Sequence, residues 1–219
     1  MLEVSGLRRD VRGQASREPR TVIYSISFSL RKGEILFVRG PSGVGKTLLL
    51  RAIASLDASQ GGAILLDGRT PSQYGFPSWR ARVAYVPQHR LNFPGTPSEL
   101  YFKAQSYKAQ KGRPRGDLPS IVQALGLAED ELNVEWHTLS GGQANRVYLA
   151  LVLALQPDVL LLDEPTGSLD PAATQRVEDL IQRVAKGGTS VVWVTHDVAQ
   201  PSRVGGRVLE LPLGTEIAA

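Results

Sequence analysis

The central motif of this sequence is Gly40-Pro41-Ser42-Gly43-Val44-Gly45-Lys46-Thr47, which has the spacing G-x-x-x-x-G-K-T of a phosphate-binding loop. An apolar run at 35–38 precedes it and indicates a buried strand. Leucines at helical spacing follow it over 48–56. A glycine-rich turn that precedes a lysine by chance needs neither flank, whereas a phosphate-binding loop needs both.

The residue types of this motif suit a bound triphosphate. The glycines let the backbone curl so that successive N–H groups point inward, and the helix that begins near Lys46 adds the positive end of its dipole. Lys46 can reach the β- and γ-phosphates, and the Thr47 hydroxyl can ligate Mg²⁺. The residues expected to bind the nucleotide here are Gly40, Pro41, Ser42, Gly43, Val44, Gly45, Lys46, Thr47 and Leu48.

Composition limits the class of protein. The chain has 219 residues, of which 42% are hydrophobic, so we expect one domain with a substantial core. It has no cysteine, which excludes disulfides, thiolate zinc sites and a catalytic thiolate. The charged residues near the start predict no secretory signal, and the longest apolar run, 147–155, is too short to cross a bilayer.

The net charge of +4 does not by itself indicate a nucleic-acid partner, because the cations are scattered along the chain. The densest basic stretch is 103–115, which contains five lysines and arginines. A solvated helix end and loop explains this stretch better than a polyanion site does. We therefore expect no nucleic acid among the partners.

Apolar patterns predict strands that alternate with helices, which is typical of a parallel sheet covered on both faces. The polar segment 8–20 is expected to be a surface loop. Prolines at 94, 97, 114 and 119 separate short helical pieces, so 89–155 is interpreted as an inserted helical sub-domain between core segments 1–88 and 156–219. The expected strands are 2–7, 21–30, 35–38, 63–66, 82–86, 158–162 and 190–195, and the expected helices are 97–111, 118–127, 140–155 and 171–186.

Two carboxylates end the apolar strand Val159-Leu160-Leu161-Leu162. Ligands of open α/β sheets bind at the carboxyl ends of the strands. Asp163 is placed to hold Mg²⁺, and Glu164 is placed to polarise the water that attacks a γ-phosphate. An acidic pair after a strand is often only a capped loop, but the phosphate-binding loop upstream favours a site.

A third motif, Leu139-Ser140-Gly141-Gly142-Gln143, precedes a long apolar helix. Ser140 can cap that helix, and the two glycines bare its first N–H groups, so this is a second anion-binding helix start. With this motif the chain resembles an ABC-type ATPase, the nucleotide-binding domain of ATP-binding-cassette proteins, over nearly its whole length. The further matching motifs are Gln88 as the Q-loop, 168–170 as the D-loop and His196 as the switch histidine.

The resemblance implies a P-loop NTPase fold with a RecA-like parallel core sheet, an N-terminal antiparallel β part and an ABC-specific helical sub-domain. It implies that Gln88 senses the metal and the lytic water, and that His196 contacts the γ-phosphate. Two chains would pair head to tail around two ATP molecules, with Asp170 at their interface. The signature residues Ser140, Gly141, Gly142 and Gln143 would then contact the nucleotide held by the second chain.

The sequence departs from the family pattern in two places. The family usually stacks adenine on an aromatic residue just after the first strand, but 6–11 contains none. Arg9 is our candidate to stack there, because a guanidinium plane can do so. The signature continues as Gln143-Ala144-Asn145-Arg146 where the family usually has Q-x-Q-R.

The resemblance implies an Mg²⁺-dependent ATP hydrolase that powers a separate transmembrane permease, bound to the cytoplasmic side of the inner membrane as a homodimer or with a paralogous cassette. Residues 89–100 would form part of the docking surface. A few residues, 192–197, resemble small cassettes of iron export or metal tolerance. One alternative is an ABC-type ATPase of lipoprotein release, division or iron–sulfur assembly. ATPases of DNA repair or translation fit less well, since only 50 residues separate Gln88 from Leu139.

Overall fold

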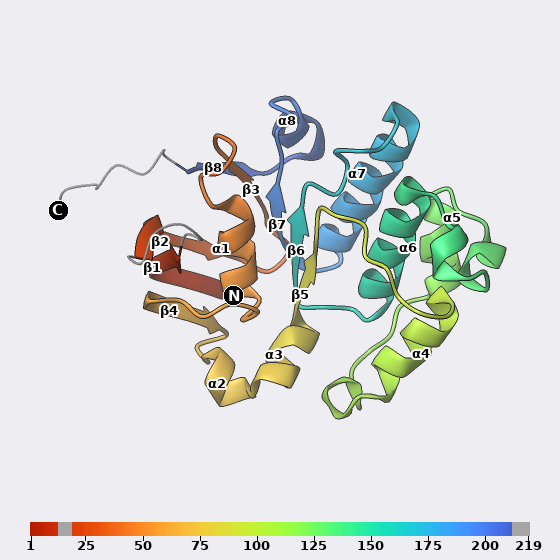
Figure 1. Cartoon of the computed structure of the whole chain (residues 1–219), viewed down its shortest axis with the longest axis horizontal. Coiled ribbons are helices and arrows are strands. Elements are labelled where there is room, and N and C mark those ends of the chain that lie inside the picture. Colours follow the sequence, from red (N-terminus) through yellow and green to blue (C-terminus); the bar gives the residue numbers. More distant parts are fainter. Residues whose placement is uncertain (13–18, 212–219) are drawn as a thin grey trace.

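The computed structural model describes residues 1–12 and 19–211, which form two β-sheets surrounded by helices (Figure 1). The larger sheet is parallel throughout, with the strand order β5-β6-β7-β3-β8. Because the strands are parallel, their carboxyl ends meet at one edge of the sheet. The strands are β3 (Ile35–Arg39), β5 (Val83–Val86), β6 (Val159–Asp163), β7 (Ser190–Val194) and β8 (Arg207–Glu210).

The three central strands, β3, β6 and β7, are buried on both faces, and their successive side chains point to opposite faces of the sheet. Leu36 and Val38 pack in a cluster with the apolar side chains of α1 (Lys46–Ile53). Phe37 and Trp193 stack with ring centroids 5.4 Å apart in a second cluster. That cluster contains the apolar side chains of α6 (Gly141–Ala154) and α7 (Pro171–Lys186). Helices α1 and α6 therefore lie on opposite faces of the sheet (Figure 1).

The smaller sheet is antiparallel and consists of β1 (Leu2–Arg12), β2 (Pro19–Leu30) and β4 (Gly61–Leu66) in the order β2-β1-β4. Leu2 pairs with Leu30 on one side and with Leu66 on the other. All three leucines are buried in the cluster that contains α1. The small sheet thus extends the core on the α1 face of the parallel sheet.

The prediction of a surface loop over 8–20 is wrong at both of its ends. Residues up to Arg12 continue β1, and β2 begins at Pro19. These strand ends carry polar side chains and therefore lack the apolar pattern that predicts a strand. In the structure, polar side chains of the two strands form hydrogen bonds with one another. The Thr21 hydroxyl donates to Asp10 Oδ1 at 2.7 Å, and Arg8 Nη2 donates to the Thr21 hydroxyl oxygen at 3.2 Å. Residues 13–18 lie outside the described part of the chain.

The helical segment after β5 contains α4 (Pro97–Ser106) and α5 (Leu118–Ala124), with short 3-10 helices between and after them. The predicted helix 97–111 ends early, because Tyr107 has extended backbone angles. Trp136 is buried in this segment, where its indole N–H donates to the Leu91 carbonyl at 2.6 Å. Phe93 meets the Trp136 ring edge-on, at 5.1 Å between centroids.

Three short α-helices and one strand were not predicted. They are α2 (Pro71–Tyr74), α3 (Phe76–Arg82), α8 (Gln200–Val204) and β8. Each has at most seven residues, which is too short for a clear periodic pattern. Across the residues that the structure describes, no helix is long and apolar enough to span a bilayer.

Candidate nucleotide-binding site

The phosphate-binding loop connects the carboxyl end of β3 to α1, as the sequence predicts. Glycine is required at two of its positions. Gly45 has φ 102°, and a Cβ there would lie 2.9 Å from Val22 Cγ1. Gly40 has φ 149°, and a Cβ there would lie 2.8 Å from the Leu211 carbonyl oxygen. Side chains at these positions would displace neighbouring atoms and distort the loop.

Within the loop, the ammonium group of Lys46 is turned inward. The residue is 6% exposed, and its Nζ donates to the Gly40 carbonyl at 2.8 Å and to the Pro41 carbonyl at 3.0 Å. A buried cation is thus held at the centre of the curl, where phosphate oxygens would be attracted. Of the remaining loop residues, Pro41, Ser42, Gly43 and Thr47 are exposed, Leu48 is half-buried and Val44 is buried.

Three predicted catalytic residues converge at the carboxyl edge of the sheet. Gln88 Nε2 donates to Glu164 Oε2 at 3.0 Å, and His196 Nε2 lies 2.9 Å from Glu164 Oε1. The three residues follow β5, β6 and β7, which are adjacent strands. Topology therefore brings together side chains that are far apart in the sequence, and it leaves both carboxylate oxygens of Glu164 in polar contact.

The backbone also holds Glu164 in place. Its φ is 50°, a left-handed conformation that costs a residue with a side chain roughly 1–2 kcal/mol. The amide N–H of Glu164 donates to the Val194 carbonyl at 3.1 Å, which ties the end of β6 to β7. The loop after β6 thus turns sharply at Glu164 and presents its carboxylate at the edge of the sheet.

Asp163 lies beside this cluster and is 2% exposed. Its Oδ2 accepts a hydrogen bond from the Tyr85 hydroxyl at 2.9 Å. Burial, with Asp163 next to it, raises the pKa of Tyr85 above its usual value, so the phenol remains a proton donor. Asp163 Oδ1 is buried and has no hydrogen-bond partner within the residues that the structure describes. This carboxylate therefore has one oxygen fixed by Tyr85 and one available to a ligand.

The sequence patterns did not indicate Tyr85 as a residue of the site. It is a polar-tipped residue in the apolar strand β5, and the register pairs it with Leu161 of β6, two residues before Asp163. An aromatic residue in a short buried strand is usually a packing residue. Only the register of β5 against β6 shows that its hydroxyl reaches the carboxylate.

The signature residues form the start of α6. Ser140 caps the helix by accepting from the Gln143 N–H at 3.3 Å, and Gln143 Oε1 accepts from the Ser140 N–H at 2.8 Å. Outside this capping box, Gln143 Nε2 also donates to Glu131 Oε1. Gly141 is exposed, and a Cβ on Gly142 would lie 3.4 Å from Leu169 Cδ2 of the D-loop region. The signature helix start and the D-loop are therefore neighbours within one chain.

The exposed Asp170 caps α7, since its Oδ1 accepts from the Ala173 N–H at 2.9 Å. This hydrogen bond holds the pKa of Asp170 below its usual value. The cap therefore stabilises the fold above the unfolded-state pKa of about 4, and it is lost as pH falls through the lower folded-state pKa.

We expect Asp170→Ala to lower Tm at pH 7, and the difference in Tm from the parent to vanish in acid. Asp170→Asn should keep most of the cap. Thermal unfolding followed by circular dichroism checks this, and equal Tm values at pH 7 for Asp170→Ala and the parent would contradict it.

The guanidinium group of Arg9 contacts a carboxylate and a backbone carbonyl of the protein. Its Nη2 lies 3.5 Å from Asp57 Oδ2, and its Nη1 donates to the Ala58 carbonyl. Asp57 also receives two hydrogen bonds of 2.9 Å from Arg51. The Arg9 side chain is only 16% exposed, so it lies against the loop that follows α1. Stacking of adenine on Arg9 stays a prediction.

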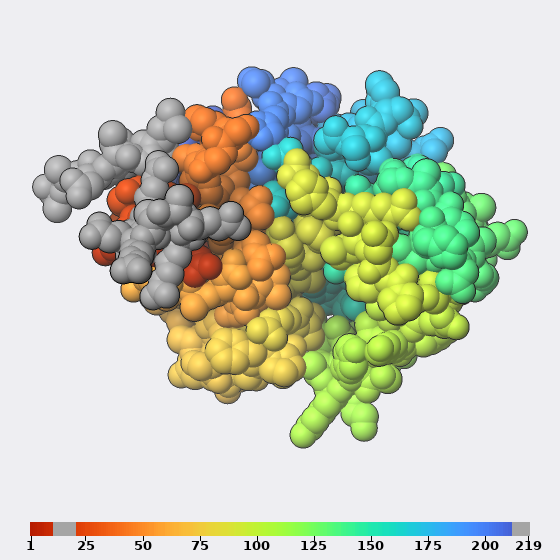
Figure 2. Space-filling view, viewed as in Figure 1, coloured from red at the N-terminus to blue at the C-terminus, as the bar shows by residue number. Residues whose placement is uncertain are grey.

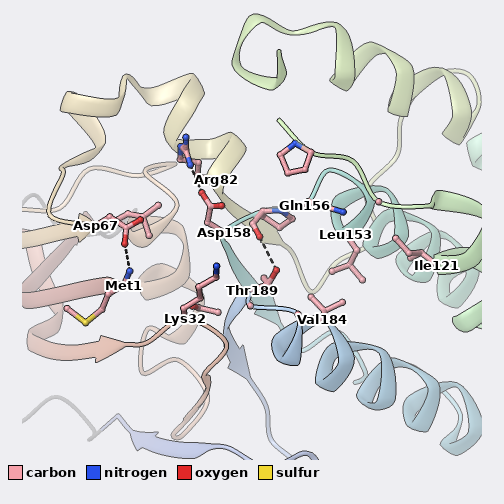
Figure 3. A pocket seen from close by; sticks show the side chains of 17 residues that line it. Met1, Lys32, Asp67, Arg82, Ile121, Leu153, Gln156, Asp158, Val184 and Thr189 are labelled. Atoms are coloured by element: carbon pink, nitrogen blue, oxygen red, sulfur yellow. Dashed lines mark hydrogen bonds and ion pairs between the residues drawn. The ribbon is translucent and has the colours of Figure 1, made fainter. Parts of the chain in front are cut away.

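A pocket of about 520 Å³ lies at the opposite end of the parallel sheet (Figure 3). It is lined by residues at the amino ends of β5, β6 and β7, including Arg82, Asp158 and Ser190. Arg82 Nη1 donates to Asp158 Oδ2 there at 2.7 Å. The Lys46 and Glu164 region is at the other edge, so this pocket is separate from the site described above.

Comparison with known proteins identifies the family. Residues 23–167 match the family model described as ABC transporter. The chain is 34% identical over 198 residues to FbpC 2 of Haemophilus influenzae, an Fe(3+) ions import ATP-binding protein. It is 36% identical over 202 residues to PstB of Mycobacterium intracellulare, a phosphate import ATP-binding protein. These alignments cover 88% and 86% of this chain, and the chain therefore belongs to the ABC transporter family.

The chain spans 55% of the length of FbpC 2 and 70% of the length of PstB. Among solved structures, dimeric MJ0796, a bacterial ABC transporter cassette, matches with a TM-score of 0.83 and 25% identity. That match covers 96% of this chain and 94% of MJ0796. The fold is that of an ABC-type ATPase cassette, so the fold class and family expected from the sequence are confirmed.

Proposed function

We propose that this chain binds and hydrolyses ATP and thereby powers a separate membrane permease. The observation that carries the proposal is the contact of Glu164 with both Gln88 and His196 at the strand edge that also bears the phosphate-binding loop. Glu164 accepts a proton from water as the water oxygen attacks the γ-phosphorus, and the bond from that phosphorus to the β–γ bridging oxygen breaks. Gln88 orients the water, and His196 donates a hydrogen bond to a γ-phosphate oxygen.

The residues present fit a bound Mg²⁺. The described residues contain no group of three or more histidine, aspartate or glutamate side chains that could enclose a metal. Mg²⁺ in nucleotide sites usually takes one or two protein ligands and completes its shell with phosphates and water. Asp163 Oδ1, which has no partner among the described residues, and the hydroxyl of the exposed residue Thr47 would supply those ligands, with Gln88 at the same edge. When bound, the ion would neutralise charge on the β- and γ-phosphates.

Tyr85→Phe tests the orientation of Asp163. The change removes the 2.9 Å hydrogen bond and leaves Asp163 Oδ2 unsatisfied. We expect binding of Mn²⁺, as a probe for Mg²⁺, to weaken about tenfold in the presence of a non-hydrolysable ATP analogue, since hydrogen bonds to charged groups contribute about 1.5–3 kcal/mol. Electron paramagnetic resonance of free Mn²⁺ measures this without turnover. Tyr148→Phe, on α6, is the matched control, and equal Mn²⁺ affinity in all three chains would contradict the role of Tyr85.

The proposed active unit is a head-to-tail pair of cassettes. Within one chain the phosphate-binding loop begins α1 and the signature begins α6, and these helices lie on opposite faces of the sheet. One nucleotide would therefore reach the signature residues Ser140 to Gln143 only on a second chain, either a copy or a paralogue. The dimeric state named for MJ0796 supports this arrangement. Asp170 would then serve both as the cap of α7 and as an interface residue.

A groove beside the site fits a permease segment. About 420 Å³ in volume, it lies between α3, β5 and the helical segment, and the space-filling view is hollowed there, between the yellow and lime regions (Figure 2). Most of its lining is apolar or aromatic, including Leu56, Leu91 and Tyr148. Leu91 belongs to the predicted docking segment 89–100. Such a groove would receive an apolar helix of the permease on the cytoplasmic side of the inner membrane.

The transported substrate does not follow from the cassette. FbpC 2 and PstB are named for Fe(3+) and for phosphate, although they are nearly equally similar to this chain. Both names specify import, which supports import here and not the metal export suggested by 192–197. No residue of the nucleotide site would contact the cargo, so the permease would select it.

Capture of the membrane partner tests the proposed function. A Glu164→Gln chain, with hydrolysis blocked, is recovered from detergent-solubilised membranes of its own host in the presence of ATP. We expect a polytopic membrane protein to be recovered with it, and Lys46→Ala, which should bind ATP more weakly, to recover less. Recovery of soluble partners only would overturn the transporter assignment and favour an assembly ATPase.

A further inference from the structure

A buried carboxylate connects the two loops that carry Glu164 and His196. Glu178 lies in the middle of α7 and is 2% exposed. Its Oε1 accepts from Gln200 Nε2 at 2.8 Å and from Arg203 Nη2 at 2.7 Å, and its Oε2 accepts from Arg203 Nε at 3.2 Å. Carboxylates this deeply buried are rare unless they are paired, and Arg203 supplies the pair here.

Both partners of Glu178 extend to the loops that carry catalytic residues. Gln200 Nε2 also donates to Thr166 Oγ1 at 3.2 Å, and Thr166 follows Glu164 by two residues. Arg203 Nη2 lies 2.6 Å from Asp197 Oδ2, and Asp197 directly follows His196. Through two branches, one buried carboxylate therefore connects the loop after β6 with the loop after β7.

Attachment of α8 to α7 does not explain this network. Gln182 of α7 already donates to the carbonyls of Arg203 and Val204, at 3.2 and 2.7 Å. The Val204 side chain also packs in the same apolar cluster as α7. Replacing a buried ion pair with apolar residues is often neutral or stabilising, so helix packing alone does not require the charges. What the charges add is their connection to Thr166 and Asp197.

We propose that Glu178 is a positioning residue that, through Gln200 and Arg203, fixes the position of the His196 loop relative to the Glu164 loop. This relative position matters because His196 Nε2 lies 2.9 Å from Glu164 Oε1, and small displacements of catalytic groups reduce rates strongly. Glu178 itself touches no reacting atom. The inference rests on the proposed function of Glu164 and His196 in ATP hydrolysis, and it adds a residue 14 positions along the chain from Glu164.

Glu178→Gln tests the proposal, because it keeps the shape of the side chain and removes its charge. We expect kcat for ATP to fall about tenfold with KM nearly unchanged, since the phosphate-binding loop is untouched. The matched control is Glu34→Gln, which breaks the ion pair with Arg207 at the amino end of β3, away from both loops. This control is expected to hydrolyse ATP at the parent's rate.

A second readout separates positioning from general stability. The chain has three histidines, so imidazole signals can be resolved by NMR, with His89 and His137 as internal references. In Glu178→Gln we expect the His196 signal to shift while the His137 signal stays in place. A folded Glu178→Gln chain with the parent's kcat and an unshifted His196 signal would overturn the proposal.

If Glu178→Gln fails to fold, Arg203→Lys provides the same test, because it keeps a cation beside the buried Glu178 and loses the guanidinium fork that also reaches Asp197. The same fall in kcat and the same His196 shift are expected, and the parent's values would overturn the proposal. A parent chain without ATPase activity would instead contradict the proposed function. The NMR comparison would still report whether Glu178 positions His196.

Discussion

Glu164→Gln is expected to leave ATP binding intact and to reduce turnover by about 10²–10⁴-fold, the usual contribution of a general base. Glutamine has nearly the same shape as glutamate, so its Oε1 can keep the contact with His196 Nε2. It accepts no proton from the attacking water, however. Because Glu164 is held by its left-handed backbone and by the Val194 carbonyl, the substituted side chain remains at the same position.

The same variant should accumulate an ATP-bound dimer, because in the proposed head-to-tail arrangement the pair would close on ATP and open only after hydrolysis. Size-exclusion chromatography with and without ATP measures the dimer, and phosphate release under saturating ATP measures turnover. Glu34→Gln serves again as a control for the loss of one carboxylate elsewhere. Hydrolysis at the parent's rate by Glu164→Gln would show that another group is the base.

Local chemistry explains which parts of the site the sequence predicts. The phosphate-binding loop and the Asp163-Glu164 pair each depend on a few consecutive residues between a strand and a helix, so short patterns suffice. The convergence of Gln88, Glu164 and His196 was expected from family resemblance, and the structure explains it by the adjacency of β5, β6 and β7. Their catalytic roles stay predictions until the variants are measured.

Contacts that depend on register could not be predicted. The Tyr85 hydroxyl reaches Asp163 only because β5 and β6 pair with Val83 opposite Val159. Glu178 looks like any polar residue of an amphipathic helix, and its burial depends on how α8 returns across α7. Likewise, the ends of β1 and β2 are polar in sequence and become strands by pairing with each other. In each case the partner is distant in the sequence, and a local pattern carries no information about it.

Lys46→Ala should produce the largest loss of nucleotide affinity, because it removes the buried cation at the centre of the phosphate-binding loop. Lys46 Nζ now donates to the carbonyls of Gly40 and Pro41, so binding exchanges these two neutral acceptors for anionic phosphate oxygens. Hydrogen bonds to charged groups contribute about 1.5–3 kcal/mol each, and every 1.4 kcal/mol changes Kd tenfold. We expect Kd for a non-hydrolysable ATP analogue to rise by about 10²-fold.

Isothermal titration calorimetry measures this Kd, and thermal unfolding shows whether the variant keeps its fold. The loop has a second source of attraction for phosphate, since its bared N–H groups and the start of α1 remain in place. Some affinity should therefore survive. The Kd of this residual binding should rise with salt concentration, but less steeply than the Kd of the parent does. Lys32→Ala removes an exposed lysine at the opposite end of the sheet and should leave Kd unchanged. If Lys46→Ala binds the analogue as tightly as the parent, phosphate recognition depends on the backbone alone, and the assignment of Lys46 is wrong.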